Sequence, residues 1–225
     1  MPRLIPAPAS QGGYTMIEAV LVVSLLLVVL IPLTTFILST QRGEGVVNDA
    51  TRQQQVTRQA METMTRWMRE ASYPQGFDYT SSAIFVTAGA TSVTFNSDPD
   101  YNGIEDQLTL ALSGTSVNET IVVPDCSSSP CDYNPGLSTQ TIDLIDNVRN
   151  ADLTACGGSG TQPLFAYSAI DQGTGVPTPI PPTQDVNQLV DISVVTITVV
   201  EDVTPNKAPT CVTLTTQVQL RNWRP

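Results

Sequence analysis

Hydrophobic residues are distributed unevenly, and their spacing divides the chain into three parts. Residues 19–41 carry no charge, and a helix of that length, at ~1.5 Å per residue, spans roughly 35 Å, enough for a bilayer core. Residues 46–71 place hydrophobic side chains three and four positions apart, which is typical of an amphipathic helix. Beyond Tyr73, short runs rich in Thr, Val and Ile alternate with turn residues. We therefore predict an α+β fold, in which a long N-terminal helix packs on an antiparallel β-sheet.

The part after Tyr73 contains eight candidate strands, and the last two are expected to form a long hairpin. The segment 171–185 is rich in Pro and Gly, so we expect an exposed, mobile loop there. The candidate strands are residues 83–87, 92–96, 107–112, 119–123, 141–145, 163–168, 190–200 and 211–222.

Charge and composition exclude several classes of function. The net charge is −11, and residues 73–225 hold three Arg and one Lys against sixteen acidic residues. Such a surface repels phosphates, so no nucleic-acid partner is predicted. The chain contains no His, which removes the commonest general base and metal ligand. Without a nucleophile motif or a phosphate-binding loop, we expect no enzyme activity.

Four cysteines follow the apolar segment, and their even number in loop-like surroundings suggests two disulfides in an oxidising compartment. Three pairings are open. We favour Cys126 with Cys131, and Cys156 with Cys211, which would join a middle loop to the last hairpin. A zinc site is the alternative, although no CxxC pair or His supports it.

Glu18 is the one acidic residue in the first 41 positions, and it lies at the edge of the apolar stretch. A carboxylate in lipid costs at least ~2.5–3.5 kcal/mol unless it has a partner. Cleavage between Gly13 and Tyr14 would create an α-amino group about one helical turn from Glu18. The positive end of the helix dipole would also stabilise the Glu18 carboxylate. A secretory signal would instead carry small residues after its apolar stretch, where this chain reads ILSTQRGEG.

The run GYTMIE at positions 13–18, followed directly by an apolar helix, resembles the N-terminal signal of type IV pilins and type II secretion pseudopilins. Tyr14 replaces the usual Phe. The run RQAMETMTRWMREAS resembles the helix pattern of W-type minor pilins and J-type pseudopilins, as do TSVTFNSDPDYNGIEDQLTLAL and the stretches IDNVRNADL, LFAYSAIDQGTG, VDISVVTITVV and TTQVQLRN.

The resemblance implies cleavage after Gly13 by a prepilin peptidase, N-methylation of Tyr14, and pairing of Glu18 with a neighbouring subunit's terminal amine. It implies a pilin fold and a single-pass protein of the bacterial inner membrane, with its C-terminal domain in the periplasm or outside. The implied partners are other pilin or pseudopilin subunits and an inner-membrane assembly platform, with a cell-surface filament as the product. The corresponding segments are a leader at 1–13, an assembly helix at 14–41, an amphipathic helix at 42–73 and a β-rich domain at 74–225.

Residues 98–106, DPDYNGIED, have the spacing of a calcium loop between two strands. Oxygen-bearing side chains at alternate positions of a tight loop can surround Ca²⁺, which prefers six to eight oxygens. The EF-hand Glu is missing, and a polar β-turn is the alternative explanation. We predict a calcium cofactor, with Glu105 as an additional candidate ligand. The predicted ligands are the side chains of Asp98, Asp100, Asn102 and Asp106 and the carbonyl of Ile104.

Two functions fit these patterns. The first is a minor pilin or pseudopilin, a structural filament subunit at or near the tip. The second is a membrane-anchored, calcium-dependent binding module or adhesin that does not polymerise. The choice of machinery stays open, because type IV pilus, type II secretion and competence machineries all use subunits with the same kind of N-terminal signal and apolar helix.

Overall fold

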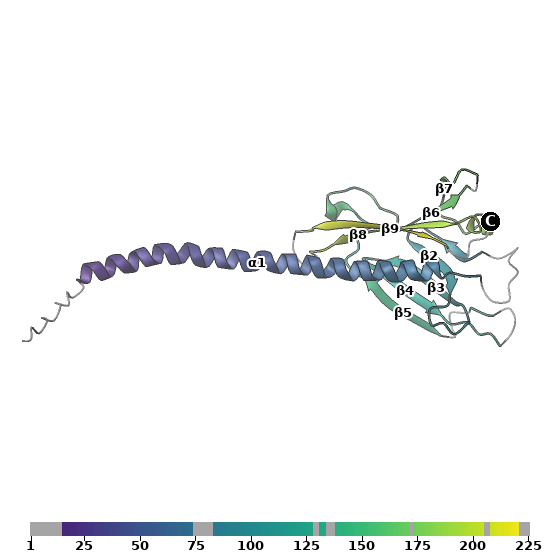
Figure 1. Cartoon of the computed structure of the whole chain (residues 1–225), viewed down its shortest axis with the longest axis horizontal. Helices are drawn as coiled ribbons and strands as arrows, with labels where there is room; N and C mark the ends of the chain where they lie inside the picture. The colour runs from purple at the N-terminus through teal and green to yellow at the C-terminus, as the bar shows by residue number, and fades with distance from the viewer. Residues whose placement is uncertain are drawn as a thin grey trace, which may run out of the picture. The chain divides into compact units, whose positions relative to one another are not determined.

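The computed structural model describes residues 15–73, 83–127, 131–133, 138–171, 173–204 and 208–220 (Figure 1). Its first element is α1, Met16–Arg69, a helix of 54 residues that includes both the apolar and the amphipathic stretch. Antiparallel strands follow, and the later part of α1 packs against them. The fold is therefore α+β, with a long N-terminal helix packed on antiparallel sheets, and the predicted pilin-like fold class is confirmed.

The contacts within the chain define two compact units, Met1–Asn48 and Asp49–Pro225. The first unit contains the apolar part of α1. The second contains the rest of α1 and all strands of the described residues, and it has a hydrophobic core of its own.

The first sheet is a meander in the order β1-β2-β3-β4-β5, so each strand pairs with the next along the chain. Gly114, with φ +62°, and Thr115 form the turn between β3 and β4, where Ser113 pairs with Ser116. Burial alternates along β3, which directs Leu108 and Leu110 into the core. The strands are β1 Phe85–Ala88, β2 Ser92–Ser97, β3 Asp106–Ser113, β4 Ser116–Val122 and β5 Thr139–Ile145.

The second sheet has four antiparallel strands in the order β7-β6-β8-β9. We expected one sheet, and the structure has two. The predicted hairpin of the last two strands is confirmed, with pairs from Val194 opposite Gln219 to Asp202 opposite Cys211. The strands are β6 Phe165–Ile170, β7 Pro177–Ile180, β8 Val194–Asp202 and β9 Cys211–Gln219.

The prediction of an unstructured loop at 171–185 is wrong in part, because β7 lies within it. Pro177 and Pro179 have no N–H to donate, but β7 is an edge strand that pairs only with β6, so both are tolerated. The predicted strand at 190–200 also begins later, at Val194. A short helix, α2 at Val186–Leu189, precedes it, and the Asp185 side chain caps α2 by accepting from the Asn187 amide.

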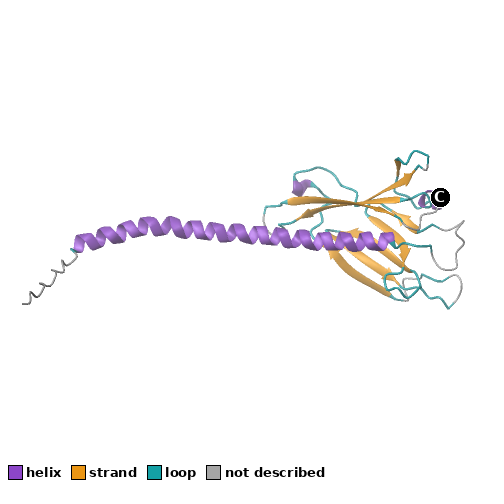
Figure 2. Ribbon diagram, in the orientation of Figure 1, coloured by secondary structure: helices purple, strands orange, loops and turns teal. Residues whose placement is uncertain are grey.

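The core lies where the later part of α1 meets both sheets (Figure 2). Met64 and Met68 of α1 are completely buried. The Phe85 ring packs edge-on against Phe95 of the same sheet and Tyr167 of the other, at centroid distances of 6.1 and 6.3 Å. Each side chain of this size contributes about 1.5–3 kcal/mol on burial, so α1 and the two sheets stabilise one another.

Candidate functional site

The first part of α1 has an apolar surface on every side. No described side chain from residue 15 to residue 41 is buried, and Val28 and Phe36 are 69% and 68% exposed. A helix with apolar residues around its whole circumference is stable in lipid or against other apolar helices. Among the described residues this is the one helix that is long and apolar enough to cross a membrane. One N-terminal helix could therefore anchor the protein by a single pass.

The few polar side chains of this stretch are satisfied locally. The hydroxyls of Ser24, Thr34, Thr35 and Ser39 each donate to the carbonyl three residues earlier, at 2.8–2.9 Å. Such bonds remove hydroxyl groups from contact with an apolar environment. Pro32 has no N–H, so the carbonyl of Val28 lacks its usual helical donor.

Glu18 lies in the first turn of α1 and is exposed. Its backbone N–H donates to the carbonyl of Thr15 at 3.0 Å and to the Thr15 hydroxyl at 3.4 Å, so this end of the helix is capped. The predicted cleavage and methylation residues, Gly13 and Tyr14, lie outside the described residues. Glu18 therefore lies near the positive end of the helix dipole, and its pairing with a terminal amine stays a prediction.

The predicted calcium loop connects β2 and β3, and its side chains are bonded to its own backbone. The two carboxylate oxygens of Asp98 accept from the amides of Asn102 and Gly103, at 3.0 and 2.8 Å. Asp100 accepts from the Asn102 amide and side chain at 3.2 and 2.9 Å, and Asn102 in turn accepts from the Ile104 amide at 2.7 Å. Gly103 has φ +85°, which explains the glycine.

Asp106 begins β3 and is 3% exposed. Within the described part of the chain, its buried Oδ1 has no hydrogen-bond partner. Burial, followed by the negative charges of Asp100 and Asp98, raises the pKa of Asp106 to about 6. A buried carboxylate without a full set of partners is costly, so this carboxylate is unfavourably placed unless a cation or donor reaches it.

Two tyrosines connect this loop to other parts of the domain. The Tyr101 hydroxyl donates to Oε1 of Glu70, just after the last turn of α1, at 2.9 Å. The Tyr133 hydroxyl donates to the carbonyl of Glu105 at 3.0 Å. Burial, with the charges of Glu105 and Asp106, raises the pKa of Tyr133 to about 12. The loop is therefore the junction of α1, the β2–β3 hairpin and the segment around residue 133.

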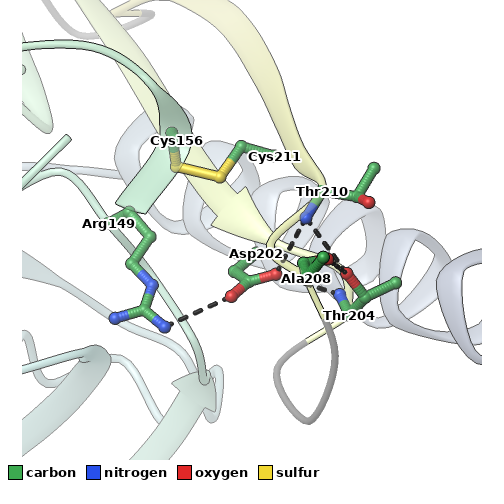
Figure 3. Close-up of polar contacts among 7 residues, drawn as sticks. All are labelled: Arg149, Cys156, Asp202, Thr204, Ala208, Thr210 and Cys211. Carbon is green, nitrogen blue, oxygen red and sulfur yellow. Dashed lines mark hydrogen bonds and ion pairs between the residues drawn. A yellow bond between two sulfur atoms is a disulfide. The ribbon is translucent and has the colours of Figure 1, made fainter. Parts of the chain in front are cut away.

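The structure has disulfides between Cys126 and Cys131 and between Cys156 and Cys211, the two pairs that the sequence favours. Cys126–Cys131 closes a short loop. Cys156–Cys211 joins the 3₁₀ helix Thr154–Cys156 to the first residue of β9 (Figure 3).

The end of the β8–β9 hairpin is held by Asp202, which is 1% exposed (Figure 3). Its Oδ2 pairs with the Arg149 guanidinium at 3.2 Å. Its Oδ1 accepts from the amides of Thr204 and Thr210 at 3.1 and 3.3 Å. A charge with this set of partners is satisfied in the interior, so Asp202 serves to hold the hairpin closed.

Two other buried acids were missed by sequence reasoning. Glu119 on β4 is 2% exposed, its Oε1 has no partner among the described residues, and burial raises its pKa to about 7. Glu201 on β8 is completely buried and accepts from Gln53 and Thr57 of α1. Glu119 lies two positions after the buried Val117, so both side chains point to the same face of β4. The two-residue period of the strand was therefore a usable signal that Glu119 is buried.

Comparison of the chain with protein-family models and with curated proteins yields no match in either case. The class of protein is therefore defined by the structure itself. It is an α+β protein of pilin-like fold, with two disulfides and a single N-terminal helix able to span a membrane.

Proposed function

We propose that this protein is a structural filament subunit, a minor pilin or pseudopilin of a type IV pilus or type II secretion pseudopilus. It would be inserted in the bacterial inner membrane with its C-terminal domain outside the cytoplasm. Prepilin peptidase would cleave it after Gly13 and methylate Tyr14. The assembly platform would then add it to a filament, at or near the tip. Its role would be structural and not enzymatic.

One observation carries the proposal: an apolar helix surface with no covering among the described residues begins at Met16, two residues before Glu18. Met16 and Ile17 are 87% and 72% exposed, and the exposure continues to Leu38 at 53%. The run GYTMIE leads directly into this surface. A helix of this kind has two suitable environments, a bilayer and a bundle of equivalent helices, and a filament subunit uses both in turn.

The physical step of assembly is the transfer of this helix from lipid to neighbouring helices. Lipid is as apolar as the side chains, so the transfer gains little from the hydrophobic effect and depends on close packing and on polar pairs. Glu18 supplies the polar pair. Its charge is unfavourable in lipid, and a terminal amine from an adjacent subunit would neutralise it at one register only.

Glu18→Ala tests this role. We expect the variant to insert in the membrane as the wild type does but to fall at least tenfold in sheared filaments, measured by immunoblot of the sheared and membrane fractions. Glu44→Ala is the matched control, since Glu44 is also an exposed acid on α1. Normal incorporation of Glu18→Ala would contradict the assigned role. N-terminal sequencing of the mature protein should return methylated Tyr14.

The second candidate is a membrane-anchored, calcium-dependent binding module that does not polymerise. The acidic β2–β3 loop favours it, because such a loop could hold a cation next to a partner. The two functions differ in where the mature protein is found. A filament subunit appears in the sheared fraction, whereas an unpolymerised binding module stays entirely in the inner membrane.

A further inference from the structure

We propose that the free edge of β9, together with the groove between β9 and α1, is a docking site for an extended, acidic segment of another protein. The segment would join the four-stranded second sheet as an additional strand next to β9. The inference goes beyond the filament function and does not depend on it.

β9 lies at one end of the second sheet and, among the described strands, pairs only with β8. The pairing keeps one register throughout, and the Leu220 amide donates to the carbonyl of Ser193 at 3.0 Å. Bonded positions alternate in an antiparallel pair, so the even-numbered residues of β9 bond to β8 and the odd-numbered residues direct their N–H and C=O groups outward. The outward set is exposed and has no backbone partner within the described ranges; it consists of Thr213, Thr215, Gln217 and Gln219.

β9 lacks the features that protect a sheet edge from pairing with another chain. Natural edge strands are short, carry Pro or charged residues, or contain bulges. β1 and β7 have four residues each, and β7 contains Pro177 and Pro179, while β5 carries Asp143 and a shift in its register with β4. β9 has nine residues, none of them charged or Pro, and its register does not shift. Of these edges, β9 is therefore the one best suited to accept a further strand.

A groove of about 530 Å³ lies between β9 and α1. Leu214, Thr215 and Thr216 line it on the side of β9, and Met61 and Thr65 are among the residues that line it on the side of α1. Side chains of a strand alternate between its two faces, so every second side chain of a strand added next to β9 would point toward α1. The groove offers room for those side chains.

The charge of the groove indicates what kind of segment fits. Its α1 side carries Arg58, Arg66 and Arg69, which are three of the ten basic residues in a chain of net charge −11. All three are exposed, and none of them forms an ion pair with another described residue. Glu62 and Glu70 also line the groove, so three Arg against two Glu leave one positive charge. Carboxylates on the incoming strand would complement the Arg side chains.

The spacing of the Arg side chains suits a strand. Arg58 and Arg69 lie roughly 16 Å apart along α1, at ~1.5 Å per residue. Side chains on one face of a strand recur about every 7 Å, so two or three carboxylates at alternate positions can face these Arg side chains. A second copy of β9 is a poorer occupant, because pairing the two edges would place like charges opposite each other. The main-chain bonds would supply affinity, and the Arg side chains would select an acidic segment.

Fluorescence anisotropy with the full chain in uncharged detergent micelles tests the site. The probe is a labelled peptide of the same length as β9 in which valine and aspartate alternate. We expect saturable binding, at least tenfold tighter than that of a peptide with lysine in place of aspartate, and weaker binding as NaCl is added. Two adjacent prolines at the centre of the aspartate peptide should also weaken binding at least tenfold. No binding of the aspartate peptide, or equal binding of all three peptides, would refute the proposal.

Variants locate the bound peptide on α1. Arg66→Glu and Arg69→Glu should each weaken binding of the aspartate peptide at least tenfold. Arg52→Glu is the matched control, because Arg52 is an exposed residue of α1 that does not line this groove, and its affinity should stay within twofold of wild type. Wild-type affinity in both groove variants would show that the peptide binds elsewhere.

Amide hydrogen exchange, followed by NMR, locates the peptide on β9. Bound peptide should slow the exchange of Thr213, Thr215 and Gln217 at least tenfold, whereas Thr216 and Val218, whose amides face β8, should change much less. No slowing at the outward amides would refute strand addition. Ultracentrifugation without peptide should show one chain per micelle. A dimer that the peptide dissociates would make a second copy the occupant and overturn the assignment to another protein.

Discussion

Glu201 on β8 is completely buried and accepts a hydrogen bond from the hydroxyl of Thr57 on α1. Gln53, one helical turn earlier, donates to the other carboxylate oxygen at 2.7 Å. Burial raises the pKa of Glu201 and the charge of Asp202 adds to this, while the bonds from Thr57 and Gln53 oppose it. The helix and the second sheet are thus joined by a polar contact within the apolar core.

Thr57→Val should lower the free energy of unfolding by about 1–3 kcal/mol at neutral pH, because it leaves a buried acceptor with one partner fewer while keeping the volume of the side chain. The loss should be smaller at acidic pH, where the carboxyl is protonated. Urea unfolding of the full chain in detergent micelles, followed by circular dichroism, measures it. Thr63→Val is the control, since Thr63 bonds only to its own helix, at the carbonyl of Gln59. An equal loss in both variants would contradict a special role for Thr57.

Glu119→Gln should stabilise the protein above pH 7. In the folded state burial raises the pKa of Glu119 to about 7 from an ordinary value of 4.5. The folded protein therefore holds this proton more tightly than the unfolded chain, and stability falls as pH rises between these two values. At about 1.4 kcal/mol per pKa unit, the cost above pH 7 is of the order of 3 kcal/mol.

The measurement is the difference in unfolding free energy between wild type and Glu119→Gln at pH 5 and pH 8. We expect the variant to gain stability relative to wild type on going to pH 8. Glu62→Gln, an exposed change on α1, serves as the matched control. A difference that does not vary with pH would show that Glu119 is not a source of the pH dependence.

The two disulfides should differ in their contribution to stability. They close loops with sequence separations of 5 and 55 residues. In the chain-entropy treatment these lengths correspond to about 2 kcal/mol for Cys126–Cys131 and about 4 kcal/mol for Cys156–Cys211. Unfolding of the Cys126→Ser/Cys131→Ser and Cys156→Ser/Cys211→Ser double variants in urea gives the comparison. A larger loss from the short loop would mean that native contacts, and not chain entropy, set the order.

Local patterns were sufficient for most of the secondary structure. The three- and four-residue spacing that includes Met64 and Met68 predicted the packed face of α1, and both residues are fully buried. Strand prediction failed at β7 because Pro177 and Pro179 argue against a strand everywhere except at a sheet edge. Whether a strand lies at an edge depends on the order of strands, which is not a local property.

In the β2–β3 loop, too, the sequence shows some features and only the packing of the chain decides others. The alternation of Asp98, Asp100 and Asn102 with Gly103 is visible in the sequence, and so is the chemistry it favours. The sequence does not show that Asp106 is buried with one carboxylate oxygen that has no hydrogen-bond partner among the described residues. Nor does it show that the Tyr101 hydroxyl bonds to Glu70. Those facts depend on how the hairpin packs against α1.

The sequence by itself therefore determined the apolar helix, the position of Glu18 and the run of antiparallel strands. These follow from composition and short-range periodicity, which act through neighbouring residues. Only the tertiary structure decided that the strands form two sheets, and that Glu201 and Asp202 lie inside. The reason is physical: strand order and the burial of a charge depend on contacts between residues far apart in the chain, and no local pattern encodes such contacts.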